Sequence, residues 1–277
     1  MLPETSGPNI LYRRTLRLRA LRAQEATKSE EKQLPLKTEA EIEAEGMTAN
    51  EIVMMILVRP FTLSFMEPIV LALNLYIALL YALLYLWFES FPIVFQGMYG
   101  FSLGVTGVAY MGILIGAFIT LPCFFWFLKT YTEPKFDSNG EIKPEFRLPP
   151  AFVGGLCIPI CMFWFGWSAG RTHWIVPIIG TGFFSVGAFL LFNSVLNYLG
   201  DAYPKYAASV YAGNDLMRSA FAASFPLFAS AMFKRLGIDW GCSLLGFLSI
   251  AFIPIPLVLF KYGERIRKHS KMARHDI

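Results

Sequence analysis

Residues Ile69 to Phe88 read IVLALNLYIALLYALLYLWF, twenty positions without a charged side chain. A helix of that length rises about 30 Å, which is the thickness of the hydrocarbon core of a bilayer. The stretch therefore predicts a membrane-spanning helix.

Five further apolar runs of similar length follow in the chain. They are Gly104–Leu128, Pro150–Ser168, Trp174–Leu199, Asn214–Phe233 and Gly241–Phe260. The whole chain of 277 residues is 55% hydrophobic and only 16% charged, whereas soluble domains carry about 25% charged residues. Only 18 of the charged residues lie between positions 61 and 260. We therefore expect an all-α membrane protein with a six-helix transmembrane domain at 69–260, preceded by a cytoplasmic segment at 1–68 and followed by a basic cytoplasmic tail at 261–277.

The basic residues set the expected orientation. Loops on the side that holds both termini carry 20 Lys and Arg residues, against 3 on the other side. The excess of positive charge on cytoplasmic loops predicts an integral membrane protein with both termini in the cytoplasm, and we expect the plasma membrane. The net charge of +4 comes from basic runs that flank apolar segments, which favours the lipid bilayer, not nucleic acid, as their partner.

Two helices are expected before the first span. Asn9 to Lys32 has helical composition, with leucines among five arginines, and is interpreted as a basic amphipathic helix at the anionic cytoplasmic leaflet. Glu39 to Val58 is expected to form a second helix, whose apolar part is too short to cross a bilayer. Arg59-Pro60 is expected to end it.

The sequence argues against an enzyme. His173, His269 and His275 lie in loops or the tail, so no histidine base or zinc ligand is expected within the bilayer. Neither an H-E-x-x-H motif nor a phosphate-binding G-x-x-x-x-G-K-[ST] loop occurs, and the four cysteines lie in apolar segments without a C-x-x-C spacing. We expect no catalytic residue, no bound cofactor and no metal.

Polar residues inside the spans are the candidate functional residues, because they are costly in hydrocarbon. Asn193, Asn197 and Asp201 recur at i, i+4 and i+8, which places them on one stripe of the fourth span. They are interpreted either as a substrate-facing stripe or as interhelical hydrogen-bonding groups followed by an aspartate at the helix end.

The first span carries a second polar stripe. Asn74, Tyr81 and Tyr85 are spaced at i, i+7 and i+11, and Glu89 follows at the extracellular end. The glutamate carboxylate is a candidate for attracting a cation or for proton coupling, and the alternative is a solvated helix end.

A charged pair marks the start of the fifth span. Asp215 and Arg218 stand at i, i+3, and Asp201 at the neighbouring helix end is expected to be a second partner of the arginine. This group is interpreted as a cytoplasmic gate or structural clamp rather than as a substrate site. In the second span, Gly112 and Gly116 stand four positions apart and predict close helix packing.

Ordered motifs along the chain resemble the second half of fungal major facilitator superfamily transporters of the twelve-helix drug:proton antiporter branch, which includes multidrug and polyamine exporters. The motifs are Pro3-Glu4-Thr5, Pro8-Asn9-Ile10-Leu11 with the basic run to Arg22, Arg59-Pro60-Phe61 with Glu67-Pro68, Phe88-Glu89-Ser90-Phe91-Pro92, Pro144-Glu145-Phe146-Arg147-Leu148, Asn197-Tyr198-Leu199-Gly200-Asp201-Ala202-Tyr203, Ala207-Ala208-Ser209, Arg218-Ser219 and Phe225-Pro226-Leu227-Phe228. Together they cover nearly the whole chain, and the first of them resembles the start of the family's central cytoplasmic loop.

The resemblance implies one half of a major facilitator fold, built from two inverted three-helix repeats, with the substrate near the midplane. By that analogy the first and fourth spans line the cavity, which adds weight to Asn74, Tyr81, Tyr85, Asn193 and Asn197. It also implies export of drugs or polyamine-like cations, driven by a proton gradient.

Three functional hypotheses follow. In the first, the chain is a C-terminal half, shortened by a gene model, a mutation or a split gene, that transports small molecules only with an N-terminal half. In the second, it is a truncated, non-transporting membrane protein that associates with a full-length transporter or an N-terminal half. In the third, two copies of the chain form a transporting homodimer.

Overall fold

The computed structural model describes residues 7–26, 36–38, 41–42, 45–138, 140–270 and 272–275. The described residues form helices, turns and loops, with no β-strand among them. They divide into two compact units, Met1–Leu57 and Val58–Ile277. The predicted all-helical class is confirmed.

The first unit begins with helix α1 (Gly7–Ala26), which falls within the range predicted to be a basic helix. Residues 27–32 of that range, and the Pro3-Glu4-Thr5 motif, lie outside the described residues. At 100° per residue, Arg13 and Arg17 lie on the side of α1 opposite Arg19 and Arg22. Basic charge therefore surrounds this helix instead of forming one face, and its binding to a leaflet stays a prediction.

The second predicted helix, Glu39–Val58, differs in the structure. Residues 46–48 are not helical, and α3 (Ala49–Val53) begins after Thr48, whose hydroxyl accepts a 3.3 Å hydrogen bond from the backbone N–H of Glu51. The Glu51 carboxylate accepts in return from the backbone N–H of Thr48 at 2.7 Å. This capping box explains the later start.

The expected break at Arg59-Pro60 was also wrong. The π-helical turn η1 (Met54–Val58) leads directly into α4 (Arg59–Met66), and this change of hydrogen-bonding pattern just before Pro60 accommodates the missing N–H of the proline. The chain is therefore helical from Ala49 to Met66, long and apolar enough to cross a membrane, and not too short as expected.

The second unit contains the remaining helices. They are α4, α5 (Pro68–Phe88), α6 (Leu103–Ala109), α7 (Met111–Phe127), α8 (Pro149–Ser168), α9 (Ile175–Ala202), α10 (Ala207–Ser224), α11 (Pro226–Phe252) and α12 (Pro254–Arg267). Short turns connect them: the π-helical turns η2 (Pro92–Met98) and η3 (Leu128–Thr132) and the 3-10 turns η4 (Glu133–Lys135), η5 (Pro144–Arg147) and η6 (Pro204–Tyr206). Proline begins α5, α8, α11 and α12, where its fixed φ favours the first helical turn.

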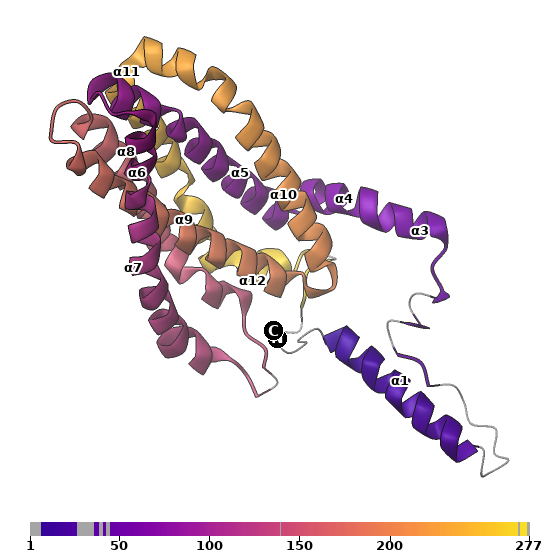
Figure 1. Ribbon diagram of the computed structural model, residues 1–277. Helices are drawn as coiled ribbons and strands as arrows, with labels where there is room; N and C mark the ends of the chain where they lie inside the picture. The colour runs from indigo at the N-terminus through magenta and orange to yellow at the C-terminus, as the bar shows by residue number, and fades with distance from the viewer. Residues whose placement is uncertain are drawn as a thin grey trace. The chain divides into compact units, whose positions relative to one another are not determined.

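Among the described residues, six helical segments are long and apolar enough to span a membrane. They are Ala49–Met66, Pro68–Met98, Leu103–Lys135, Pro144–Ser168, Ile175–Ala202 and Pro226–Arg267. Each of the first four predicted spans coincides with one of these segments. The predicted fifth span instead begins inside α10 and ends in α11, and the predicted sixth lies in α11 and α12. The turn between them is Gly237, whose φ of +79° suits glycine. Figure 1 shows the chain reversing in α11.

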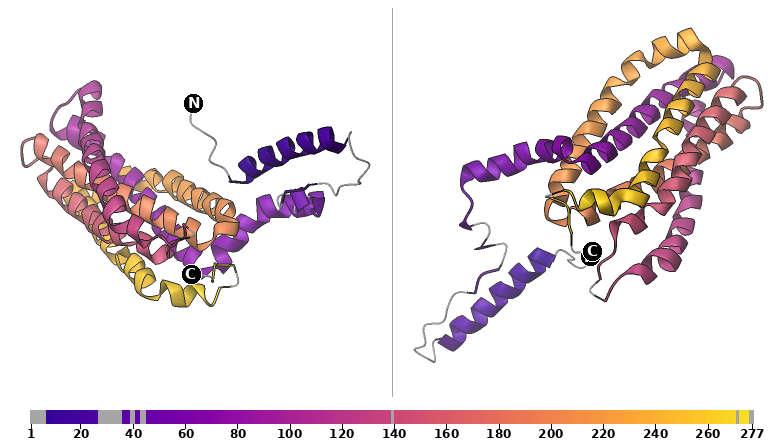
Figure 2. Two further views of the ribbon diagram at one scale, coloured as in Figure 1. Left: turned by 90° about the horizontal axis from the view of Figure 1, so that it is seen from below. Right: turned by 180° about the vertical axis from the view of Figure 1, so that it is seen from behind.

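Helix α9 is a central helix of the second unit, because α7 and α8 both pack against it. Helix α5 packs along α10, α8 packs between α9 and α11, and α7 packs on α9 (Figure 1 and Figure 2). The predicted close approach at Gly116 is confirmed, because a Cβ there would lie 2.6 Å from the carbonyl oxygen of Gly182 on α9. Glycine at these positions lets the two backbones meet.

An aromatic cluster fixes α5 against α8 and α9. The buried ring of Trp87 lies 5.3 Å from the ring of Phe165 and 5.0 Å from that of Phe184, and Phe91 lies 4.9 Å from Trp87. Large rings in such contacts bury more area than any other side chains and add edge-to-face attraction. The cluster holds the first and fourth predicted spans together.

Candidate functional site

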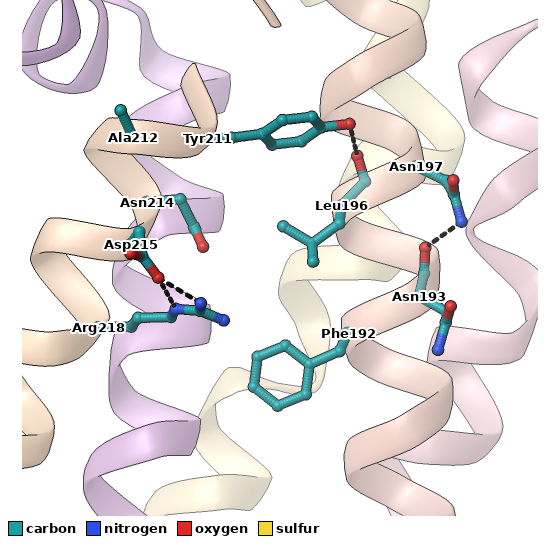
Figure 3. A pocket seen from close by; sticks show the side chains of 9 residues that line it. All are labelled: Phe192, Asn193, Leu196, Asn197, Tyr211, Ala212, Asn214, Asp215 and Arg218. Carbon is teal, nitrogen blue, oxygen red and sulfur yellow. Dashed lines mark hydrogen bonds and ion pairs between the residues drawn. The ribbon is translucent and has the colours of Figure 1, made fainter. Parts of the chain in front are cut away.

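A cavity of about 670 Å³ lies between α9 and α10 (Figure 3). It is lined by Phe192, Asn193, Leu196, Asn197, Tyr211, Ala212, Asn214, Asp215 and Arg218. The volume is within the range of small-molecule sites, and the lining combines apolar walls with a few polar groups, as such sites do.

The α9 side of the cavity offers hydrogen-bond acceptors. Asn193 donates its Nδ2 to the carbonyl oxygen of Phe189 at 2.9 Å, and Asn197 donates its Nδ2 to that of Asn193 at 2.7 Å. Because a carbonyl can only accept, the amide nitrogen of each side chain must face the helix backbone. The Oδ1 atom and the second Nδ2 proton of Asn193 and Asn197 therefore remain available to a ligand.

The α10 side is built from a turn-by-turn row of polar side chains. Tyr211, Asp215 and Arg218 stand at i, i+4 and i+7, and so share one helix face. The Tyr211 hydroxyl donates to the carbonyl oxygen of Leu196 at 3.0 Å, which ties α10 to α9. The Arg218 Nε donates to Asp215 Oδ1 at 2.7 Å, so the ion pair predicted between these residues is confirmed.

Tyr81 of α5 joins the site through Arg218. The Arg218 Nη1 donates to the Tyr81 hydroxyl at 3.1 Å, and the guanidinium carbon lies 4.8 Å from the centre of the Tyr81 ring. This ring also makes an edge-to-face contact with Phe192, with ring centroids 4.9 Å apart. The predicted cavity residue Tyr81 thus contacts two lining residues without lining the cavity itself.

Asn74 lies one layer behind the cavity. Its Oδ1 accepts from Asn214 Nδ2 at 2.9 Å, and its Nδ2 donates to Ser64 Oγ at 3.1 Å. All three side chains are buried, in α5, α10 and α4. The amide that the sequence marks as a cavity residue therefore joins three helices, and a role in contacting substrate stays a prediction.

Tyr85 and Glu89 lie further along α5. The half-exposed Tyr85 ring stacks on Tyr81 at 6.2 Å. Glu89 is exposed just after the last residue of α5, and no hydrogen bond or ion pair of its side chain is found within the described part of the chain. Neither residue lines the cavity. Their proposed roles in substrate attraction remain untested.

Asp201 was wrongly expected to pair with Arg218. Its Oδ2 accepts from Arg147 Nε at 2.8 Å, at the end of α9. Arg218 stands eleven residues into α10, about 16 Å along the helix from its start, and so lies too far from that end. Asp201 therefore binds the loop before α8 and takes no part in the cavity.

The sequence interpretation missed Tyr211, Asn214, Phe192 and Leu196 as lining residues. Because the fifth span was started at Asn214, Tyr211 was placed in a loop. Its i, i+4 and i+7 relation to Asp215 and Arg218 is the signal that could have found it. The two apolar residues carry no such signal, because most apolar side chains in a span face lipid or helix.

No protein-family model and no solved structure matches the chain. Three curated fungal proteins are similar over nearly its full length. Transporter mfs1 of Schizosaccharomyces pombe is 45% identical, covering 98% of this chain and 51% of its own length. Multidrug transporter FLR1 of Candida glabrata is 43% identical, covering 98% and 48%. Fluconazole resistance protein 1 of Saccharomyces cerevisiae is 41% identical, covering 97% and 48%. The chain spans about half the length of the curated relatives it matches.

Proposed function

We propose that this chain belongs to the fungal major facilitator family of multidrug transporters and acts in the export of small drug-like molecules through the cavity between α9 and α10. The observation that carries the proposal is the cavity of about 670 Å³ with asparagine, tyrosine and charged side chains on facing helices of an integral membrane protein. The names of the relatives describe transporters, which supports a role in transport rather than in catalysis.

The free hydrogen-bonding groups of the cavity favour a class of substrate. The two asparagine amides of α9 can both accept and donate, the exposed Asp215 carboxylate can only accept, and Arg218, a donor, is already engaged with Asp215 and Tyr81. Phe192 and Leu196 add apolar surface. A neutral or cationic molecule with N–H groups and an apolar body fits this lining, so drugs and polyamine-like amines are better candidates than anions.

Transport by this family of fold needs a second six-helix unit to complete the cavity. An N-terminal half is the proposed partner, and a second copy of the chain is the alternative. Helix α7 offers a surface for such a unit, because Phe118, Ile119, Phe125 and Trp126 are exposed along it. Both termini are proposed to face the cytoplasm of a plasma-membrane protein, and a proton gradient is proposed to drive export.

Drug accumulation in yeast lacking its own exporters tests the proposal. The chain is expressed alone, with the N-terminal half of a relative, and with that half plus Asn193→Leu in the chain. Lower drug accumulation is expected only with the partner, and Asn193→Leu is expected to restore accumulation. A chain that co-purifies with the partner and leaves drug accumulation unchanged would overturn the proposal and favour a non-transporting associate.

A further inference from the structure

The guanidinium group of Arg218 is held by four contacts, two from Asp215 of α10 and two from Tyr81 of α5. Asp215 of α10 accepts from its Nε at 2.7 Å and also contacts its Nη2. Tyr81 of α5 accepts from its Nη1 at 3.1 Å and presents its ring face at 4.8 Å. Carboxylate on one side and aromatic face on another is the arrangement with which proteins bind delocalised cations.

These contacts adjoin the open cavity. The Asp215 side chain is 62% exposed, while that of Arg218 is 27% exposed, so the carboxylate is the more accessible partner of the pair. Both residues line the cavity. The Tyr81 ring also packs against Phe192 in an edge-to-face contact with ring centroids 4.9 Å apart. A cationic ligand in the cavity can therefore reach Asp215 directly, and it can reach the Tyr81 ring once the Arg218 side chain moves aside.

We propose that Tyr81 and Asp215 form a subsite for a planar, delocalised cation such as a guanidinium group, and that Arg218 occupies this subsite as a tethered ligand. One carboxylate balances one cation, so a ligand and Arg218 exclude each other from it. A ligand must displace the Arg218 side chain, which reduces the affinity of the resting site and selects ligands that bind elsewhere in the cavity as well.

The inference rests on the proposed function only for the role of the subsite in export. Cation binding itself is a property of the purified chain and needs neither a drug nor a second half. A chain that fails to export drugs can still bind the cation, and an exporting chain can fail to bind it, so the two failures are distinguishable.

The experiment removes the tethered ligand and supplies a free one. Purified full-length chain in nanodiscs is titrated with methylguanidinium chloride, with sodium chloride at equal ionic strength as control, and the unfolding temperature is followed by tryptophan fluorescence. The wild-type chain is expected to show no saturable shift. Arg218→Ala is expected to gain a saturable rise of about 3 °C at ten times the dissociation constant.

Second-site variants identify where the cation binds. Adding Asp215→Asn or Tyr81→Leu to Arg218→Ala is expected to abolish the saturable rise. Adding Tyr81→Phe keeps the ring and is expected to preserve most of it. If Arg218→Ala proves unstable, Arg218→Lys replaces it, because the lysine keeps the positive charge. This variant is expected to show a saturable rise in unfolding temperature smaller than that of Arg218→Ala. The absence of a saturable rise in both Arg218 variants, or a rise that persists with Asp215→Asn, would overturn the proposal.

Discussion

Arg267 of α12 donates two parallel hydrogen bonds, each of 3.0 Å, to the carboxylate of Glu145 in the turn before α8. Both side chains are nearly inaccessible, with 1% and 10% of their surfaces exposed. Removing one member of a buried ion pair leaves the other charge unpaired. The pair therefore fixes the C-terminal end of α12 to the turn before α8. The same turn is also tied to α9 by the ion pair between Arg147 and Asp201.

Arg267→Ala is expected to lower the free energy of unfolding by about 3 to 5 kcal/mol, because the buried Glu145 carboxylate loses its partner. Thermal or denaturant unfolding of the purified chain measures this. The double variant Arg267→Met with Glu145→Gln is expected to recover most of the loss. Equal losses in the single and double variants would show that the charge pairing is not the cause.

Gly116→Ala tests the contact between α7 and α9. The added methyl group would lie 2.6 Å from the Gly182 carbonyl oxygen, so the helices must separate, at a cost of about 1 to 3 kcal/mol in unfolding free energy. Gly107→Ala in α6 is the matched control, because nothing lies within 4 Å of its Cβ position. If both substitutions change stability equally, the close backbone approach is not what holds α7 in place.

Asn74→Leu is expected to destabilise the chain by about 1 to 3 kcal/mol, because it leaves the Nδ2 of buried Asn214 without its acceptor. Replacing both Asn74 and Asn214 by Leu is expected to restore much of that stability. Asn197→Ala, at an exposed position, should change it by less than about 0.5 kcal/mol. Unfolding measurements on the three variants compare the contribution of the buried Asn74–Asn214 pair to stability with that of the exposed Asn197.

The contact between Arg19 and Glu41 in the first unit is expected to depend on pH. The backbone N–H of Thr38, with Arg19, lowers the pKa of the Glu41 carboxyl below its ordinary value. A lowered pKa in the folded state means that the stabilisation is present above the unfolded value of about 4.3 and is lost as pH falls through the folded value. The protection factor for amide hydrogen exchange at Glu41 and Ile42, which compares the measured rate with the intrinsic rate at the same pH, should fall as pH drops through the folded value. Glu41→Gln should show the low protection factor at every pH, and an unchanged protection factor in that variant would contradict this.

Much of the fold was predictable from Ile69–Phe88 and the runs that follow it, because hydrocarbon imposes both length and polarity on a spanning helix. The sequence predicts a chain reversal between Phe233 and Gly241 but not that it occurs at Gly237, since a single glycine with positive φ has no hydropathy signature. The helix across Pro60 was missed because the π-helical turn at Met54–Val58, which has no sequence signature, lets the chain continue past the proline.

The site was partly predictable for a similar reason. Periodicity places Asn193 and Asn197 on one stripe, and both line the cavity. It cannot say which neighbouring helix a charge will meet, so Arg218 was assigned to Asp201, whereas its actual partner across helices is Tyr81. Likewise, Asn74 has the residue type of a binding group, yet its partners on α4 and α10 depend on tertiary packing.

The central claim is that the cavity between α9 and α10 receives the exported molecule, and its most direct test is protection of Asn197→Cys from a thiol reagent by an exported drug. The control is Lys205→Cys, an exposed position in η6 that lies outside the cavity, and both variants carry Cys123→Ala. With the chain and an N-terminal half together in membranes, a saturating drug is predicted to slow modification at residue 197 several-fold while leaving that at residue 205 unchanged. Equal modification rates at residue 197 with and without drug would contradict the account.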